Sequence, residues 1–144
     1  TKRGKDRMIS LYDGKIQVDT EKTQKWIDLE KTKSIEEAIA FSRGMARKMQ
    51  LKDEQWIPCF AWNEQNWIEK RFLNRDDLDR ISTKQPVIAI RECGNVVAVN
   101  TRALEKLDFL NADPDDGKVE IERDAKGRPT GILKDALKPT ENLE

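Results

Sequence analysis

Residues 86–99 read PVIAIRECGNVVAV, which is two apolar runs joined by a polar bend. Residues 86–90 and 96–99 have the length and the β-branched composition of strands. A strand that is apolar on both sides must be covered on both faces. The two runs therefore predict two strands at the centre of a sheet, with other segments packed above and below it.

The segments that precede this pair follow strand patterns. Asp13-Gly14 supplies the positive φ angles of a two-residue turn, so residues 8–12 and 15–18 are predicted to form a hairpin. Residues 26–29 alternate apolar and polar side chains, which predicts an edge strand. Residues 55–61 predict another strand, and because its proline cannot donate to a ladder, that strand is expected at an edge or at a bulge.

Capping residues mark the predicted helices. In Ser34-Ile35-Glu36-Glu37 the serine is expected to accept the Glu37 amide, and the glutamate to reach back to the serine amide, ahead of an apolar stripe that continues to about residue 50. Asn74, followed by two carboxylates, predicts a short helix. Asn100 or Thr101 can cap another helix. A last helical turn or two is expected over residues 134–137.

Residues 118–123 and 130–133 alternate around a tight turn and predict a second hairpin, after a turn-rich loop at 113–117. Interleaved strands and helices predict an α+β fold, with a small mixed sheet of about five to seven strands and helices packed mainly on one face. We expect a single domain over residues 1–144, with residues 1–7 frayed.

The composition excludes several classes of partner. The 27 basic and 27 acidic side chains cancel, so no long-range field favours nucleic acid or an anionic membrane. No apolar run approaches the roughly 20 residues of a membrane helix, and we expect a cytoplasmic protein. Cys59 and Cys93 are expected to be reduced, with a redox pair or a nucleophilic thiolate as the alternative.

The chain contains no histidine. Zinc hydrolases usually rely on imidazole ligands, and the adjacent carboxylates of this sequence occur where caps and turns are predicted. The residues therefore predict neither a metal site nor a catalytic residue within this chain.

Two features remain as candidates for binding. Trp56, Trp62 and Trp67 occur at short spacing, and large amphipathic side chains of this kind either seal a core or line a cleft. Arg91 and Glu92 end a buried strand, where they could present charges to a pocket or form a surface ion pair at a sheet edge.

Taken in order, several segments resemble a known family. They are Asp28-Leu29 with Ser34-Ile35-Glu36-Glu37, Glu54 to Ile57, Trp62-Asn63-Glu64 with Trp67, Arg75 to Asp79, Pro86 to Leu104 and Ile121 to Leu133. Over residues 27–137 the sequence resembles amidohydrolase family 3, which includes N-substituted formamide deformylases.

The resemblance implies a parent enzyme built on a (β/α)₈ barrel, with this region as an insertion after the first barrel strand that overhangs the active site. The implied cofactor is a divalent metal, with zinc expected, which activates water against an amide-type C–N bond. The implied partners are the barrel domain and a small-molecule substrate. Trp62, Trp67, Arg91 and Asn95 are the substrate-facing candidates.

The sequence departs from the family pattern at three places. The paired metal-binding histidines would precede Asp28, where residues 19–25 contain none. The family usually has glycines at the positions of Cys59 and Ala61, and a histidine at the position of Asn95. An asparagine can hydrogen-bond a substrate but cannot replace an imidazole as an acid, a base or a typical metal ligand.

Two functions follow from these observations. The first is an insertion or substrate-cap domain of a metal-dependent amidohydrolase that is inert as an isolated chain. The alternative is a stand-alone, non-catalytic binding or interaction domain that uses the tryptophan cluster as its surface.

Overall fold

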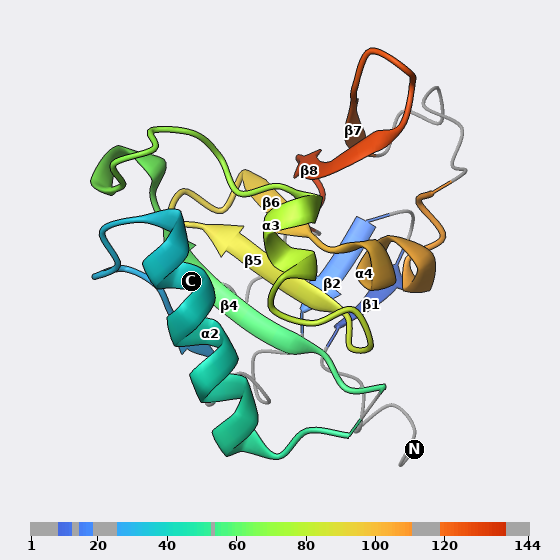
Figure 1. Cartoon of the computed structure of the whole chain (residues 1–144). Coiled ribbons are helices and arrows are strands. Elements are labelled where there is room, and N and C mark those ends of the chain that lie inside the picture. The colour runs from blue at the N-terminus through green and yellow to red at the C-terminus, as the bar shows by residue number, and fades with distance from the viewer. Residues whose placement is uncertain (1–8, 13–14, 19–25, 53, 111–118, 138–144) are drawn as a thin grey trace.

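The computed structural model describes residues 9–12, 15–18, 26–52, 54–110 and 119–137 (Figure 1). Some predictions concern residues outside these ranges, namely the frayed start at 1–7, the Asp13-Gly14 turn, the segment 19–25 and the loop at 113–117.

Strands make up most of the regular structure. They are β1 (Ile9–Tyr12), β2 (Lys15–Val18), β3 (Ile27–Asp28), β4 (Ile57–Trp62), β5 (Val87–Arg91), β6 (Val96–Val99), β7 (Glu120–Arg123) and β8 (Pro129–Lys134). β1 and β2 form the predicted hairpin, and the other six form one sheet in the order β3-β4-β5-β6-β8-β7. The pairs β3–β4 and β4–β5 are parallel, whereas the remaining pairs are antiparallel. The predicted mixed sheet is confirmed.

β5 and β6 lie in the middle of this sheet and contribute to both of its faces. Val87 and Ala89 belong to one buried cluster, together with residues of the first helix. Ile88 and Val97 belong to a second cluster on the other side. The alternation of strand side chains therefore explains why both runs of residues 86–99 are apolar throughout.

The first helix, α2 (Ile35–Met49), begins at the predicted cap. The Glu37 amide donates to Ser34 Oγ at 3.0 Å. The reciprocal bond differs from the prediction, because Glu37 Oε1 accepts the amide of Lys33 at 2.7 Å and not that of Ser34. The Glu37 side chain therefore binds the backbone one residue before the N-cap, at Lys33.

The strand that contains the proline was predicted at an edge or at a bulge. It is not an edge strand, and although it has a bulge, that bulge is at Ala61 and not at the proline. β4 lies inside the sheet, and Pro58 is paired in register with Ile88 of β5. The backbone amide of Ile57 donates to Pro86 O on the β5 side. Backbone groups alternate between the two neighbouring strands, so those of Pro58 and Phe60 point toward β3. The pairing of β3 with β4 starts only at Cys59, so the missing amide costs no ladder bond.

A register shift does occur in β4, between Phe60 and Trp62. The residue between them, Ala61, has a φ of 66°, which is the left-handed region that favours glycine. The glycine that the family resemblance leads us to expect at position 61 thus corresponds to a backbone requirement of the bulge.

Two shorter helices follow, α3 (Arg75–Asp79) and α4 (Thr101–Lys106), with the 3-10 turn η2 (Glu64–Asn66) between β4 and α3. Asn74 caps α3 as predicted. Asn100 caps α4 through the Ala103 amide at 2.8 Å, and its fully buried side chain also accepts from Val87 N and donates to two carbonyl groups. The side-chain amide of Asn100 thus connects α4, β5 and the loop before β5 through hydrogen bonds.

The predicted second hairpin is present as β7 and β8, whereas the predicted helical turn over residues 134–137 is wrong. β8 extends through Lys134, and Leu137 forms a parallel bridge with Ile16. The Ile16 amide donates to Ala136 O at 2.6 Å. Pairing with β2 therefore uses backbone groups that a helical turn would need.

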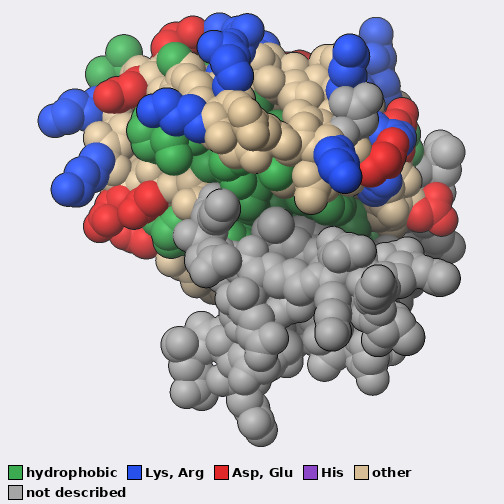
Figure 2. Space-filling view, turned by 90° about the horizontal axis from the view of Figure 1, so that it is seen from below, with side chains coloured by type: hydrophobic (Ala, Val, Ile, Leu, Met, Phe, Trp, Pro, Cys, Tyr) green, Lys and Arg blue, Asp and Glu red, His purple; other side chains and the backbone are tan. Residues whose placement is uncertain are grey.

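The sheet separates two layers of side chains. α2 and α3 contribute to the first cluster, while α4 and the buried Ile16 of β2 contribute to the second, so two of the three described α-helices cover one face. α2, with 15 residues, is the longest, and no described helix has the length and apolarity to cross a membrane. On the face drawn in Figure 2, basic and acidic side chains of the described residues are interspersed.

Candidate functional site

The carboxyl ends of β3, β4 and β5 meet at one edge of the sheet, because these three neighbouring strands are parallel. In Figure 1 the segment that contains η2 and the loop before α3 lies at this edge, beside the arrowhead of β5. The loops that follow these ends carry polar side chains from separate parts of the sequence. Open sheets with parallel strands bind ligands at such an edge.

An ion pair between Arg91 and Glu64 occupies this edge. Arg91 Nε donates to Glu64 Oε1 at 2.8 Å, and Nη2 donates to Oε2 at 2.9 Å. Glu64 is buried, with 7% of its surface exposed. The hydrogen bonds from Arg91 hold the pKa of the Glu64 carboxyl below its ordinary value despite that burial, and the same bonds raise the pKa of Arg91.

Aromatic side chains form a layer beneath the ion pair. The rings of Trp62 and Trp67 stack at 5.7 Å between centroids, and Phe72 meets Trp62 edge-on. The Arg91 guanidinium lies 5.7 Å from the centroid of the Phe72 ring. Stacking between two aromatic rings and the placement of a cation above a ring each stabilise a fold by about 0.5–1.5 kcal/mol.

Both of these tryptophans are buried, with 0% and 1% of their surfaces exposed. Trp62 Nε1 donates to Ala89 O at 2.8 Å, and Trp67 Nε1 donates to Thr32 Oγ1 at 2.9 Å. Because their surfaces are covered and their polar atoms are bonded internally, the structure favours the core interpretation of Trp62 and Trp67 over the cleft interpretation. Trp56 also lies apart from this layer, packed against the second cluster.

Arg91 and Glu92 do not form a surface ion pair with each other, which was one of the two alternatives for these residues. Glu92 Oε1 accepts Asn63 Nδ2 at 2.8 Å, while Arg91 pairs with Glu64. β5 is also an inner strand and not a sheet edge. Arg91 is the last residue of β5 and Glu92 opens the turn that follows, and the side chain of Asn63 contacts both of them.

Cys93 and Asn95 lie in the turn between β5 and β6, where Gly94 has a φ of 82°. The Asn95 amide donates to Cys93 Sγ at 3.4 Å. Partial burial acts to raise the pKa of the Cys93 thiol, but the Asn95 amide and the Arg91 guanidinium outweigh it, so the pKa lies below its ordinary value. Both side chains are exposed, so Asn95 can meet a ligand from solvent.

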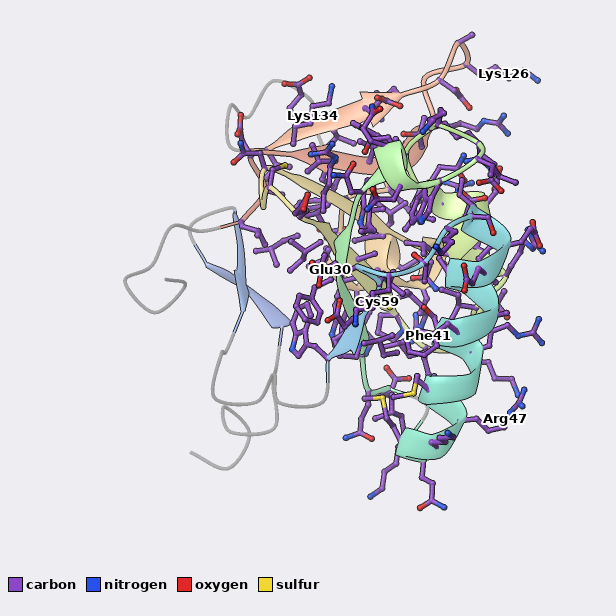
Figure 3. The ribbon with its side chains drawn as sticks, turned by 90° about the vertical axis from the view of Figure 1, so that its left-hand side faces the viewer. Glu30, Phe41, Arg47, Cys59, Lys126 and Lys134 are labelled. Atoms are coloured by element: carbon purple, nitrogen blue, oxygen red, sulfur yellow. The ribbon has the colours of Figure 1, made fainter. Side chains whose placement is uncertain are left out.

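The two cysteines occupy different environments. Cys59 lies in the layer between β4 and α2 (Figure 3), where its Sγ is 3.6 Å from Ser42 Oγ and burial raises the pKa of its thiol to about 12. Cys93 is exposed, and both cysteines are free thiols. The structure does not pair the two cysteines.

The carboxylates of this edge do not form a metal site. In the part of the chain that the structure describes, no group of three or more Cys, Asp and Glu side chains is arranged to hold a metal ion. Glu64 is engaged by Arg91, and Asp77 is engaged by the α3 cap and by Arg71. The described residues therefore do not fit a divalent metal.

Sequence reasoning missed Glu64. In the sequence, Glu64 lies between Trp62 and Trp67, two core residues in the pattern WNEQNW of residues 62–67. A charged residue enclosed by core positions needs a partner of opposite charge, and that was the available signal.

Comparison with known proteins identifies the family. Residues 18–143 match the amidohydrolase family. This chain belongs to that family. The chain is similar to YtcJ of Bacillus subtilis (strain 168), a protein named as an amidohydrolase. The two sequences are 36% identical over 89 residues, and this match covers 62% of this chain and 17% of YtcJ.

Two solved structures resemble this amidohydrolase chain. One is an uncharacterized metal-dependent hydrolase from Pyrococcus horikoshii OT3, with a TM-score of 0.53 and 26% identity. The other is an uncharacterized metal-dependent hydrolase from Pyrococcus furiosus, with a TM-score of 0.53 and 24% identity, which supports the fold. Each match covers 78% of this chain and 19% of the other chain. The chain thus spans less than a fifth of the length of these relatives.

Proposed function

We propose that this chain is an insertion or cap region of a metal-dependent amidohydrolase that acts on amide-type C–N bonds, and that it is inert by itself. The family match over residues 18–143 carries the proposal. The chain has no histidine, and its described residues form no metal-binding cluster, so the metal and its activated water would belong to other parts of the enzyme.

The carboxyl-end edge of the sheet is the surface that we assign to the substrate. Arg91 keeps part of its side chain exposed, and Asn95 is exposed on the adjacent turn. Trp62 and Trp67 are assigned a supporting role beneath Arg91, since neither has a surface to offer. For the same reason they provide no exposed patch for the alternative, a stand-alone binding domain.

The finer details of the proposal come from the resemblance to formamide deformylases. N-substituted formamides and related amides are the proposed substrates, zinc is the proposed metal, and a barrel domain is the proposed partner. A barrel places its active site at the carboxyl ends of its strands, where an inserted region can cover a substrate.

The cap role is tested in the complete enzyme by the substitution Arg91→Met. The variant is expected to lose kcat/KM for an N-substituted formamide by about tenfold or more, because hydrogen bonds to charged groups contribute about 1.5–3 kcal/mol. Bound metal, measured by elemental analysis, is expected to stay unchanged. Unchanged kinetics, or loss of the metal, would count against a substrate-facing cap.

A further inference from the structure

We propose that Glu64 is a positioning residue, which holds the Arg91 guanidinium in one orientation toward a neutral acyl or amide oxygen of a bound ligand. The inference rests on the proposed function, in which Arg91 faces the substrate. Glu64 itself does not touch the ligand and acts through Arg91.

The geometry of the pair fixes the plane of the guanidinium. The two bonds, from Nε to Oε1 and from Nη2 to Oε2, are nearly equal at 2.8 and 2.9 Å. A fork that binds both oxygens of one carboxylate cannot rotate about its Nε–Cζ bond without breaking a bond. Phe72 lies against the guanidinium, 5.7 Å from centroid to Cζ.

The backbone that carries Glu64 is held in place by the 3-10 turn η2. Glu64 opens η2, which Asn63 Oδ1 caps by accepting the Gln65 amide at 2.9 Å. Trp67 N donates to Glu64 O at 3.1 Å, and the buried ring of Trp67 anchors that end of the turn. The backbone of Glu64 is therefore fixed, and Arg91 keeps both of its bonds to the carboxylate only in the orientation that Glu64 sets.

Arg91 is also next to the turn between β5 and β6. It ends β5, and Cys93 and Asn95 follow it by two and four residues with exposed side chains. A ligand at this turn can meet both an arginine and an asparagine donor. Neither donor depends on a metal.

The local charge selects the type of oxygen. The Glu64 carboxylate already neutralises Arg91, and two further charged groups beside the pair, Glu92 and Lys70, have opposite signs. No excess positive charge is left to attract a phosphate group. A neutral amide or acyl oxygen accepts hydrogen bonds without needing such a charge.

The test uses ¹⁵N-labelled samples of the 144-residue chain and follows the Arg91 Nε–H signal by NMR. In Glu64→Gln, proton exchange at Nε is expected to speed up by about tenfold or more, because a charge-assisted bond is lost. Glu64→Asp keeps the charge but retracts it by one methylene, and it is expected to show the same loss. Glu30→Gln is the matched control, since it removes an exposed carboxylate after β3 and is expected to leave the signal unchanged.

Ligand binding is then followed with acetamide and with inorganic phosphate as probes. Acetamide is expected to shift the Arg91 Nε and Asn95 Nδ2 signals of the wild-type chain, and these shifts are expected to be lost in Glu64→Gln and Glu64→Asp. Wild-type exchange in Glu64→Asp would overturn the positioning role, because charge alone would then suffice. Stronger shifts with phosphate, or none with acetamide, would overturn the assigned ligand.

These outcomes are separate from those that test the proposed function. Absence of amidase activity in a complete enzyme would refute the function and leave the NMR result on Glu64 standing. Should Glu64→Gln fail to fold, as judged by loss of dispersed amide signals, Glu64→Asp decides the question, because it keeps a negative charge opposite Arg91.

Discussion

Replacement of Gly131 by alanine gives a sharp test of how β8 packs against α3 and β6. Gly131 has a φ of 96°, and a Cβ placed on it would lie 2.6 Å from Arg75 N, 2.6 Å from Val99 O and 2.8 Å from Arg75 Cβ. Two of these atoms belong to the backbone. The neighbours cannot yield by rotating a side chain, so the sheet or the start of α3 must shift.

The expected cost combines two effects. A non-glycine residue in a sparsely populated region of positive φ costs about 1–3 kcal/mol. Forcing extra volume into a packed site costs about 1–3 kcal/mol more. Gly131→Ala is therefore expected to lower the free energy of unfolding by about 2–6 kcal/mol, which is a large part of the 5–15 kcal/mol typical of folded domains.

Urea unfolding followed by far-UV circular dichroism measures this loss, and two other glycines serve as matched controls. Gly127 has a φ of 82° but open space around its Cβ position, so Gly127→Ala should show the strain without the collision. Gly44 lies within α2 with nothing within 4 Å, so Gly44→Ala should stabilise the chain by about 1 kcal/mol. The reasoning is refuted if Gly131→Ala is no less stable than Gly127→Ala.

Three further predictions concern the thiols, the buried asparagine and the ion pair. Ellman's reagent at mildly alkaline pH should modify Cys93 promptly and Cys59 only after unfolding, because burial raises the pKa of Cys59 to about 12; rapid reaction of both thiols would contradict this. Asn100→Ala should lower the free energy of unfolding by about 2–4 kcal/mol in urea titrations, since it leaves the buried Val87 amide without its acceptor, and a loss below about 1 kcal/mol would argue against that role. The hydrogen bond from Arg91 lowers the pKa of Glu64 in the folded chain. The ion pair therefore stabilises the fold fully above the unfolded-state pKa of about 4.3, and this stabilisation is lost as the pH falls through the lower folded-state pKa. Acid titration monitored by fluorescence should therefore show a shallower loss of stability for Glu64→Gln than for the wild-type chain, and parallel curves would exclude this contribution.

Local signals were sufficient for much of the fold. The caps at Ser34 and Asn74 were predicted because each depends on a side chain and a backbone amide three residues away. The central strands were predicted because burial on both faces leaves a continuous apolar run. Helix caps and central strands can both be predicted without knowing which segments pack beside them.

The predictions that failed depend on neighbours that a local pattern does not reveal. Pro58 is tolerated inside the sheet because β3 is too short to need its amide. Residues 134–137 are not helical, because Asp135 has a φ of 54° and the amide of Ile16, more than a hundred positions earlier, donates to the Ala136 carbonyl. Long-range pairing decided both cases.

The candidate site was predicted in part. Arg91 could be singled out because it ends a buried strand, and Asn95 because of the family resemblance, but the partner of Arg91 could not. Glu64 is 27 residues away, and only the parallel pairing of β4 with β5 brings it beside Arg91. The two tryptophans were ambiguous because an indole serves a core and a cleft equally well, and their hydrogen bonds to Ala89 O and Thr32 Oγ1 favour the core.

The central claim is that this amidohydrolase-family chain carries no complete catalytic site of its own. The most direct measurement is amine release from N-substituted formamides by the purified 144-residue chain, with and without added Zn²⁺, alongside equilibrium dialysis of the metal. We predict no hydrolysis above the metal-only blank and no stoichiometric binding of zinc. Zinc-stimulated turnover that follows the chain through purification, together with one bound zinc per chain, would contradict the claim.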